Sequence, residues 1–189
     1  MPKTFGLIVG PGNTDALVRR AEALAEGNGT ISGLMTKLAE VRLYVVAQVA
    51  ALDRDIRRLV RREPALKRFM TVPGVAPITA VAFLSTIDDP ERFKHAWDVG
   101  LYLGLTPTRY QSGETDRHGC ISKCGDAFTR TCLYEAANVL LLKVQRLSSL
   151  KARCTRLVKR IGAKKARVAV ARKIAVILRC IWTDGAEFS

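Results

Sequence analysis

The sequence predicts an all-α protein, and three observations lead to that class. Apolar residues between positions 32 and 62 recur at steps of three and four, which is the spacing of one helix face. Clusters of Gly and Pro divide the remaining chain into segments of helix length. Apolar residues make up 48% and aromatic residues 6%, which fits a soluble, mostly helical protein. With 189 residues the chain can form one or two small domains, and it has no apolar run of 18 residues or more, so no membrane span is expected.

The first region, residues 1–31, is predicted to hold a short extended lead-in and one helix. Residues 1–12 end in Gly10-Pro-Gly12, and their apolar run at 7–9 is too short for a signal peptide. A helix over 15–26 is capped by Asn13 or Thr14, and Gly27-Asn-Gly29 ends it.

The second region, residues 32–62, is predicted to be one long helix with a near-heptad apolar seam. The seam has one four-residue stutter between Val45 and Val49. Its members are Leu34, Leu38, Val41, Val45, Val49, Leu52, Ile56 and Leu59. Such a seam needs a second helix along its length, and two partners stay open: an antiparallel helix of this chain, or a coiled coil between subunits.

The third region, residues 63–189, opens with a turn that resembles a helix-hairpin-helix. Pro73-Gly74 forms the turn, and Pro77 suits the first position of a helix that ends before Asp88-Asp-Pro90. In such a turn the free backbone N–H groups near Gly74 and Val75 would hold a nucleic-acid phosphate without reading sequence. The alternative is a tight interhelical turn without a ligand.

The remaining elements are predicted to be helices around one irregular loop. Two short helices cover 90–93 and 96–103, with Phe93, Trp97, Leu101 and Tyr102 as core, and Trp97 packs rather than offering a base-stacking platform. Asp126 caps a helix over 127–145, and Gly162 separates the last two helices, 147–161 and 163–183.

The loop over residues 106–119 carries the candidate chemistry. It is polar and holds a single serine, Ser112, which Gly113 follows and which Arg109, Arg117 and His118 flank. A serine hydroxyl among cations suits attack on a phosphodiester, because cations stabilise the doubly charged transition state, and the glycine allows close backbone approach. The alternative is an inert polar loop.

The charge of +14 predicts a polyanionic partner. Residues 136–183 contain no acidic residue but thirteen basic ones: Lys143, Arg146, Lys151, Arg153, Arg156, Lys159, Arg160, Lys164, Lys165, Arg167, Arg172, Lys173 and Arg179. Such a stretch repels itself unless a polyanion neutralises it, so nucleic acid is favoured over a membrane surface. The residues expected to contact nucleic acid here are Lys164, Lys165, Arg172 and Lys173, and the residues expected at the scissile phosphate are Arg109, Arg117, Lys123 and Arg130.

No metal site or cofactor is expected in this chain. The five cysteines form no C-x-x-C pair, and the two histidines, His95 and His118, complete no zinc-ligand spacing. Reduced thiols are typical of a cytoplasmic protein.

Several runs of residues together resemble one known family. They are Thr71-Val-Pro-Gly-Val-Ala-Pro-Ile-Thr-Ala80, Ile87-Asp-Asp-Pro-Glu-Arg-Phe93, Gly104-Leu-Thr-Pro107, Gln111-Ser-Gly-Glu114, Ile121-Ser-Lys-Cys-Gly-Asp126, Leu133-Tyr-Glu-Ala-Ala137, and a tail ending in Trp182-Thr-Asp-Gly-Ala-Glu-Phe188. They are similar to the C-terminal half of the serine transposases of the one-ten/eleven-eleven class of bacterial insertion sequences, the bridge-RNA-guided recombinases. The similarity covers essentially the whole chain from the long helix onward.

The resemblance implies that two domains share the catalytic groups. Full-length members have a RuvC-like nuclease domain with four metal-binding carboxylates, then a coiled coil, then this domain. It implies that Ser112 forms a covalent phosphoserine link to DNA, while magnesium is held by the nuclease domain of a neighbouring subunit. The partners implied are DNA, a guide RNA and further copies of the chain joined through the coiled coil, at the nucleoid of a bacterial cytoplasm.

This chain departs from the pattern because it contains no nuclease domain, so it is expected to be a truncated member that is inactive alone. Its acids, among them Asp88, Glu91, Glu114 and Asp126, are dispersed turn and cap residues and form no two-metal cluster. The other hypotheses are a non-catalytic helical nucleic-acid-binding remnant and a basic structural protein such as a ribosome-associated one. The Ser112 loop favours the transposase over the structural protein.

Overall fold

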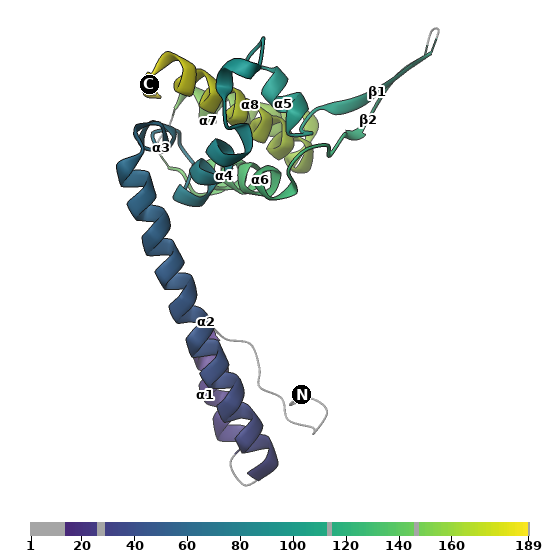
Figure 1. The fold of residues 1–189 in the computed structure, drawn as a ribbon. Coiled ribbons are helices and arrows are strands. Elements are labelled where there is room, and N and C mark those ends of the chain that lie inside the picture. The colour runs from purple at the N-terminus through teal and green to yellow at the C-terminus, as the bar shows by residue number, and fades with distance from the viewer. Residues whose placement is uncertain (1–13, 26–28, 113–114, 146–147, 189) are drawn as a thin grey trace. The chain divides into compact units, whose positions relative to one another are not determined.

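The computed structural model describes residues 14–25, 29–112, 115–145 and 148–188. These residues are mostly helical, which confirms the predicted all-α class (Figure 1). The chain divides into two compact units, residues 1–55 and residues 56–189, which are described separately below.

The first unit contains α1 (Thr14–Ala25) and most of α2 (Gly29–Arg62). Ala21 and Ala25 of α1 are buried. Helix α2 begins three residues before the predicted start and ends at the predicted residue. Its seam residues lie open to solvent, with exposed fractions between 45% and 62% for Leu34, Leu38, Val41, Val45, Val49 and Leu52. The seam is therefore available to another helix, as a coiled coil would require.

The second unit is a helical domain built around its last helix. Its other helices are α3 (Pro64–Phe69), α4 (Pro77–Ile87), the 3-10 helix η2 (Pro90–Arg92), α5 (Asp98–Tyr102), α6 (Ala127–Leu142) and α7 (Ser149–Ile161). The last helix, α8 (Ala163–Asp184), packs against α3, α5, α6 and α7. It can do so because it carries a buried apolar stripe: Ala166, Val170, Ile174 and Leu178 are at most 1% exposed.

Aromatic rings and two buried threonines join the helices of this domain. The ring of Phe69 meets Phe83 and Trp182 edge to face, each at a centroid distance of 5.6 Å. Thr129 of α6 donates a hydrogen bond from its hydroxyl to the Ala82 carbonyl of α4, at 3.2 Å. A buried hydroxyl that has a backbone partner stabilises the contact between α4 and α6 instead of weakening it.

Of the four residues predicted as core around α5, one is buried, and Trp97, Leu101 and Tyr102 are exposed. Phe93 is buried, but Trp97 is 63% exposed and Leu101 is 54% exposed. Helix α5 has five residues and turns one side, Val99 and Gly100, towards the domain. Positions 97 and 101 are four apart and share the opposite side. The prediction that Trp97 packs in the core is therefore wrong; its ring stacks on His95 at a centroid distance of 4.6 Å.

The segment predicted to be an irregular loop forms a β-hairpin instead. Strands β1 (Pro107–Ser112) and β2 (Thr115–Ile121) pair antiparallel, with Arg109 opposite His118 and Ser112 opposite Thr115. Figure 1 shows the two strands extending away from the helices of the domain. The prediction failed because an arm that buries neither face needs no apolar alternation, which is the usual mark of a strand.

Candidate nucleic-acid interface

The hairpin is anchored to the domain by close backbone contacts. The amides of Ser122 and Lys123 donate to the carbonyls of Thr106 and Gly104, at 3.0 and 3.1 Å. Gly104 and Gly125 both have positive φ, and a side chain on Gly125 would overlap the Tyr102 carbonyl. Only glycine fits at such an approach, so these two positions fix where the arm leaves the domain.

Arg130 completes this anchor from the first turn of α6. Its Nη1 donates to the carbonyl oxygens of Leu103 and Cys124, at 3.1 and 2.9 Å. The predicted contact of Arg130 with the scissile phosphate stays a prediction, and the contacts in the structure are those of a structural guanidinium. An unfavourable cation at this end of a helix is tolerated because nearby carbonyls accept its hydrogen bonds.

Asp126 caps α6, as predicted. Its carboxylate accepts a hydrogen bond from the Thr129 amide at 2.6 Å. The hydrogen bonds from the Thr129 backbone and side chain, with Arg130 adding a smaller attraction, hold the pKa of Asp126 below its usual value. The Asp126 carboxylate therefore serves as the N-cap of α6.

Ser112 lies at the far end of β1 and is exposed. Five residues separate it from Pro107 at the base, which at about 3.3 Å per residue puts it roughly 17 Å along the strand. In the backbone register of the hairpin, Ser112 pairs with Thr115, Tyr110 with Arg117, and Arg109 with His118. Gly113, the other predicted member of this cluster, lies outside the described residues.

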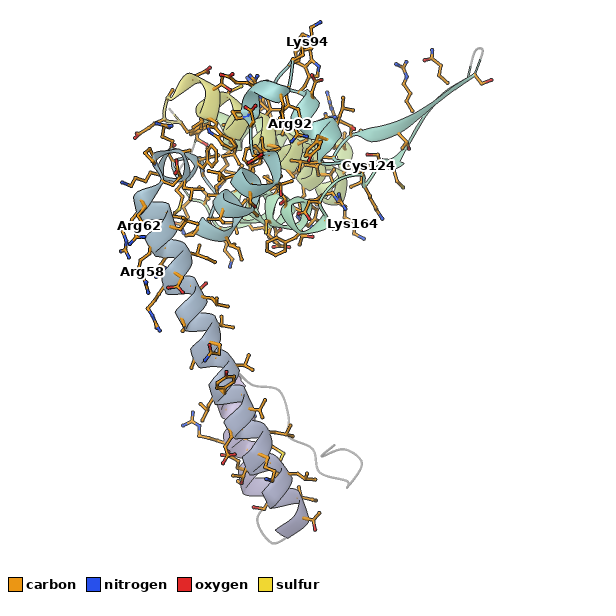
Figure 2. All side chains as sticks on the ribbon, viewed as in Figure 1. Arg58, Arg62, Arg92, Lys94, Cys124 and Lys164 are labelled. Carbon is orange, nitrogen blue, oxygen red and sulfur yellow. The ribbon has the colours of Figure 1, made fainter. Side chains whose placement is uncertain are left out.

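Four of the predicted nucleic-acid contacts do come together, at the base of the hairpin. A cleft of about 580 Å³ lies there, and its basic lining residues are Lys123, Lys164, Lys165 and Arg172. Lys123 follows β2, and the other three come from the first turns of α8. Figure 2 shows Lys164 and Cys124 on the side of the domain from which the hairpin leaves. We call this site the hairpin-base cleft.

The remaining predicted contacts lie elsewhere in the domain. Gly74 has φ +93°, and a side chain there would overlap the Ala136 carbonyl of α6. The Val75 amide donates to the Val72 carbonyl at 3.1 Å, and its side chain is buried. The turn is thus packed against α6. Lys173 lines a second groove, between α7 and α8.

Sequence reasoning did not single out three arginines of that groove, Arg153, Arg156 and Arg160. They belong to the acid-free stretch, and their spacing of three and four residues could have indicated a shared helix face.

The described residues contain no group of three or more His, Cys, Asp or Glu side chains that could hold a metal ion. Among them, too, no helix has the length and apolar character that crossing a membrane requires.

Fold and site together define a class of protein. It is a strongly basic helical domain with a β-hairpin that carries a serine at the end of its first strand and a cationic cleft at its base. Residues 66–155 match the sequence profile described as "Transposase IS116/IS110/IS902 family". This part of the chain is therefore similar to the transposases of the IS116/IS110/IS902 family, in agreement with the resemblance drawn from its motifs.

Similar proteins carry matching names. The chain is 29% identical to "Putative transposase y4pF/y4sB" of Sinorhizobium fredii over 97% of its own length and 49% of that protein. It is 31% identical to "Probable family 20 transposase" of Pseudomonas aeruginosa over 77% of its own length and 43% of that protein. It is 28% identical to the transposase for insertion sequence element IS1328 of Yersinia enterocolitica, over 82% of its own length and 47% of that protein. The chain thus spans less than half the length of each of these relatives.

Proposed function

We propose that this chain acts in DNA transposition, with Ser112 as the nucleophile that cleaves a DNA strand. The observation that carries the proposal is the position of Ser112: an exposed hydroxyl at the end of an arm, in a domain similar to transposases. A core serine could not reach a DNA strand, and an exposed serine with only a structural role would not need an anchored arm.

In the proposed step the Ser112 Oγ attacks the phosphorus of a phosphodiester. The bond from phosphorus to one deoxyribose oxygen breaks, the serine proton passes to a base or to water, and the leaving oxygen takes up a proton. A phosphoserine ester joins protein to DNA, and attack by the hydroxyl of another strand reverses the step and frees the serine. The free energy of the ester is thereby retained for strand exchange.

The hairpin-base cleft does not supply the activation that this step requires at Ser112. Its cations lie at the base of the arm, and Ser112 is roughly 17 Å along β1 from Pro107, which lines the cleft. We therefore propose that the tip is completed by another domain or subunit, whose carboxylates would hold magnesium; that cation would stabilise the negative charge of the transition state. In that arrangement the hairpin-base cleft positions the DNA backbone, and the chain alone is inactive. The proposed place of action is the nucleoid in a bacterial cytoplasm.

Two further partners belong to this proposal. A second copy of the chain would pack on the exposed seam of α2, because a row of apolar side chains at heptad spacing stabilises helix pairing. A guide RNA would share the basic surface with DNA, because phosphate recognition by Lys and Arg does not depend on the sugar.

The decisive experiment tests whether this chain forms a covalent adduct with DNA. The chain is mixed with a full-length relative whose own nucleophilic serine is replaced, together with guide RNA, donor DNA and magnesium. We expect a protein–DNA band at the mass of this 20.8 kDa chain plus DNA, lost in Ser112→Ala and kept in the control Ser122→Ala. If the wild-type chain binds the DNA without any adduct, it is a non-catalytic nucleic-acid-binding protein.

A further inference from the structure

The groove between α7 and α8 differs in character from the hairpin-base cleft. Its volume is about 440 Å³, and four exposed cations form its rim: Arg153, Arg156 and Arg160 from α7, and Lys173 from α8. Its floor is apolar and consists of Cys154, Leu157, Ala169 and Val170. Ala169 also lines the hairpin-base cleft, so the two hollows meet at one residue of α8.

The electrostatics of the groove favour an anion. Helix α7 contains five basic residues and no acidic one, and α8 has no carboxylate before Asp184. The three arginines lie at positions i, i+3 and i+7 and therefore share one face of α7 over a rise of about 10 Å. Three like charges so placed repel one another, and this repulsion is relieved when phosphates bind between them.

The apolar floor identifies the kind of nucleic acid. A duplex keeps its bases stacked inside and would present only phosphates to the rim, so the floor would stay uncovered. An unpaired nucleotide can lay its base on the partly exposed side chains of Leu157 and Ala169 while its phosphates meet the arginines. No aromatic residue lines the groove, so one flat guanidinium group can also stack on the base while the others bind phosphate.

We propose that the α7/α8 groove binds unpaired nucleotides of a single-stranded nucleic acid, as a site separate from the hairpin-base cleft. This inference rests on the proposed nucleic-acid function but not on catalysis by Ser112. The strand can come from a guide RNA or from an opened DNA duplex, which share the phosphate and the exposed base.

The experiment compares two variants with equal loss of charge. The groove variant is Arg153→Gln/Arg156→Gln/Arg160→Gln. The control is Lys67→Gln/Lys94→Gln/Lys143→Gln, whose three residues are exposed but lie on three different segments. Binding of labelled single-stranded RNA, single-stranded DNA and duplex DNA is measured by fluorescence anisotropy over a series of salt concentrations, and circular dichroism checks the fold.

We expect the groove variant to bind single strands about tenfold or more weakly than the control. The slope of log affinity against log salt should fall by about 2, since three contacts at roughly 0.7 each are lost. Duplex affinity should match that of the control. If the groove variant loses affinity only for single-stranded RNA, or only for single-stranded DNA, that nucleic acid is the one that the groove binds.

Equal single-strand binding by the two variants overturns the inference, as does an equal loss for single strands and duplex. An independent test uses the unaltered chain: thiouridine- or thiothymidine-containing strands are crosslinked by light and the modified peptides are mapped. Adducts on peptides that contain residues 153–160 or 169–173 support the groove, and adducts only on other peptides contradict it. Neither result bears on whether Ser112 forms an adduct with DNA.

Discussion

At the scale of single residues, much of the chemistry that looks functional in the sequence serves to hold the domain together. Gly74 lies in the predicted phosphate-binding turn, yet its backbone approaches the Ala136 carbonyl too closely for any side chain. Arg130 lies beside a polar turn, yet its guanidinium binds carbonyl oxygens. Residue type alone does not separate these roles, because a group that would bind a phosphate also binds a carbonyl.

Gly74→Ala tests the structural role of the turn. The new methyl group meets the Ala136 carbonyl and must also adopt φ +93°, so we expect a loss of about 2 kcal/mol in the free energy of unfolding. Chemical denaturation followed by circular dichroism measures it. Gly33→Ala is the control, because the space there is open and α-helical, and a small gain is expected. An unchanged midpoint for Gly74→Ala would contradict the close approach.

Asp126 gives the domain a pH-dependent component of stability. Its folded-state pKa is lowered, so its stabilisation is fully present above the unfolded-state pKa of about 3.9 and is lost as pH falls through the lower, folded-state pKa. We expect Asp126→Ala to lower the melting temperature at neutral pH. The difference from wild type should shrink in acid, and Asp126→Asn, which keeps a capping oxygen, should lose less at neutral pH. A difference that is constant across this acid range would be inconsistent with a charged cap.

At the scale of secondary-structure elements, the two exposed features are the arm and the long helix. The arm sets Ser112 apart from the domain, while two glycines and Arg130 fix its base. The helix α2 leaves its seam uncovered over six apolar positions. In both elements the residues proposed to act, Ser112 and the seam of α2, are exposed.

The seam predicts self-association. Leu38→Asp/Val45→Asp places two charges in the seam, and burying them in a coiled coil costs several kcal/mol. We expect wild-type chain to sediment as a dimer or larger species, and the double variant to sediment at a lower mass with unchanged helicity. Lys37→Asp, outside the seam, serves as the control. Sedimentation equilibrium measures the masses, and equal masses for all three proteins would leave the seam without a role in assembly.

At the scale of the whole molecule, a net charge of +14 is concentrated where the clefts lie. Helices α7 and α8 carry eleven of the thirteen basic residues of the acid-free stretch, and both hollows are lined by residues of these helices. A long-range attraction towards nucleic acid and a set of local phosphate contacts thus come from the same two helices.

Duplex binding should therefore depend steeply on salt. For the hairpin-base cleft variant Lys123→Gln/Lys164→Gln/Lys165→Gln, we expect the slope of log affinity against log salt to fall by nearly 3, at roughly 0.9 for each lost contact. The Lys67→Gln/Lys94→Gln/Lys143→Gln control should keep most of the wild-type slope. If the affinity of the wild-type chain for duplex DNA does not change with salt, electrostatic attraction is not the basis of DNA binding.

The sequence by itself determined most of the helices, the cap at Asp126 and the basic character of the chain. These follow from spacing along the chain and from composition, which act locally and can be read without a partner. The resemblance to a transposase family also followed from the sequence, because the motifs that carry it are linear.

Only the tertiary structure decided that Ser112 stands on a β-arm, that Trp97 faces solvent, and that Lys123 of one element meets Lys164, Lys165 and Arg172 of another. The reason is physical: which groups meet, and which side of a short helix is covered, depends on residues far apart in the chain. An arm exposed on both faces leaves no hydrophobic period in its sequence, so its pairing is visible only once its two strands are seen together.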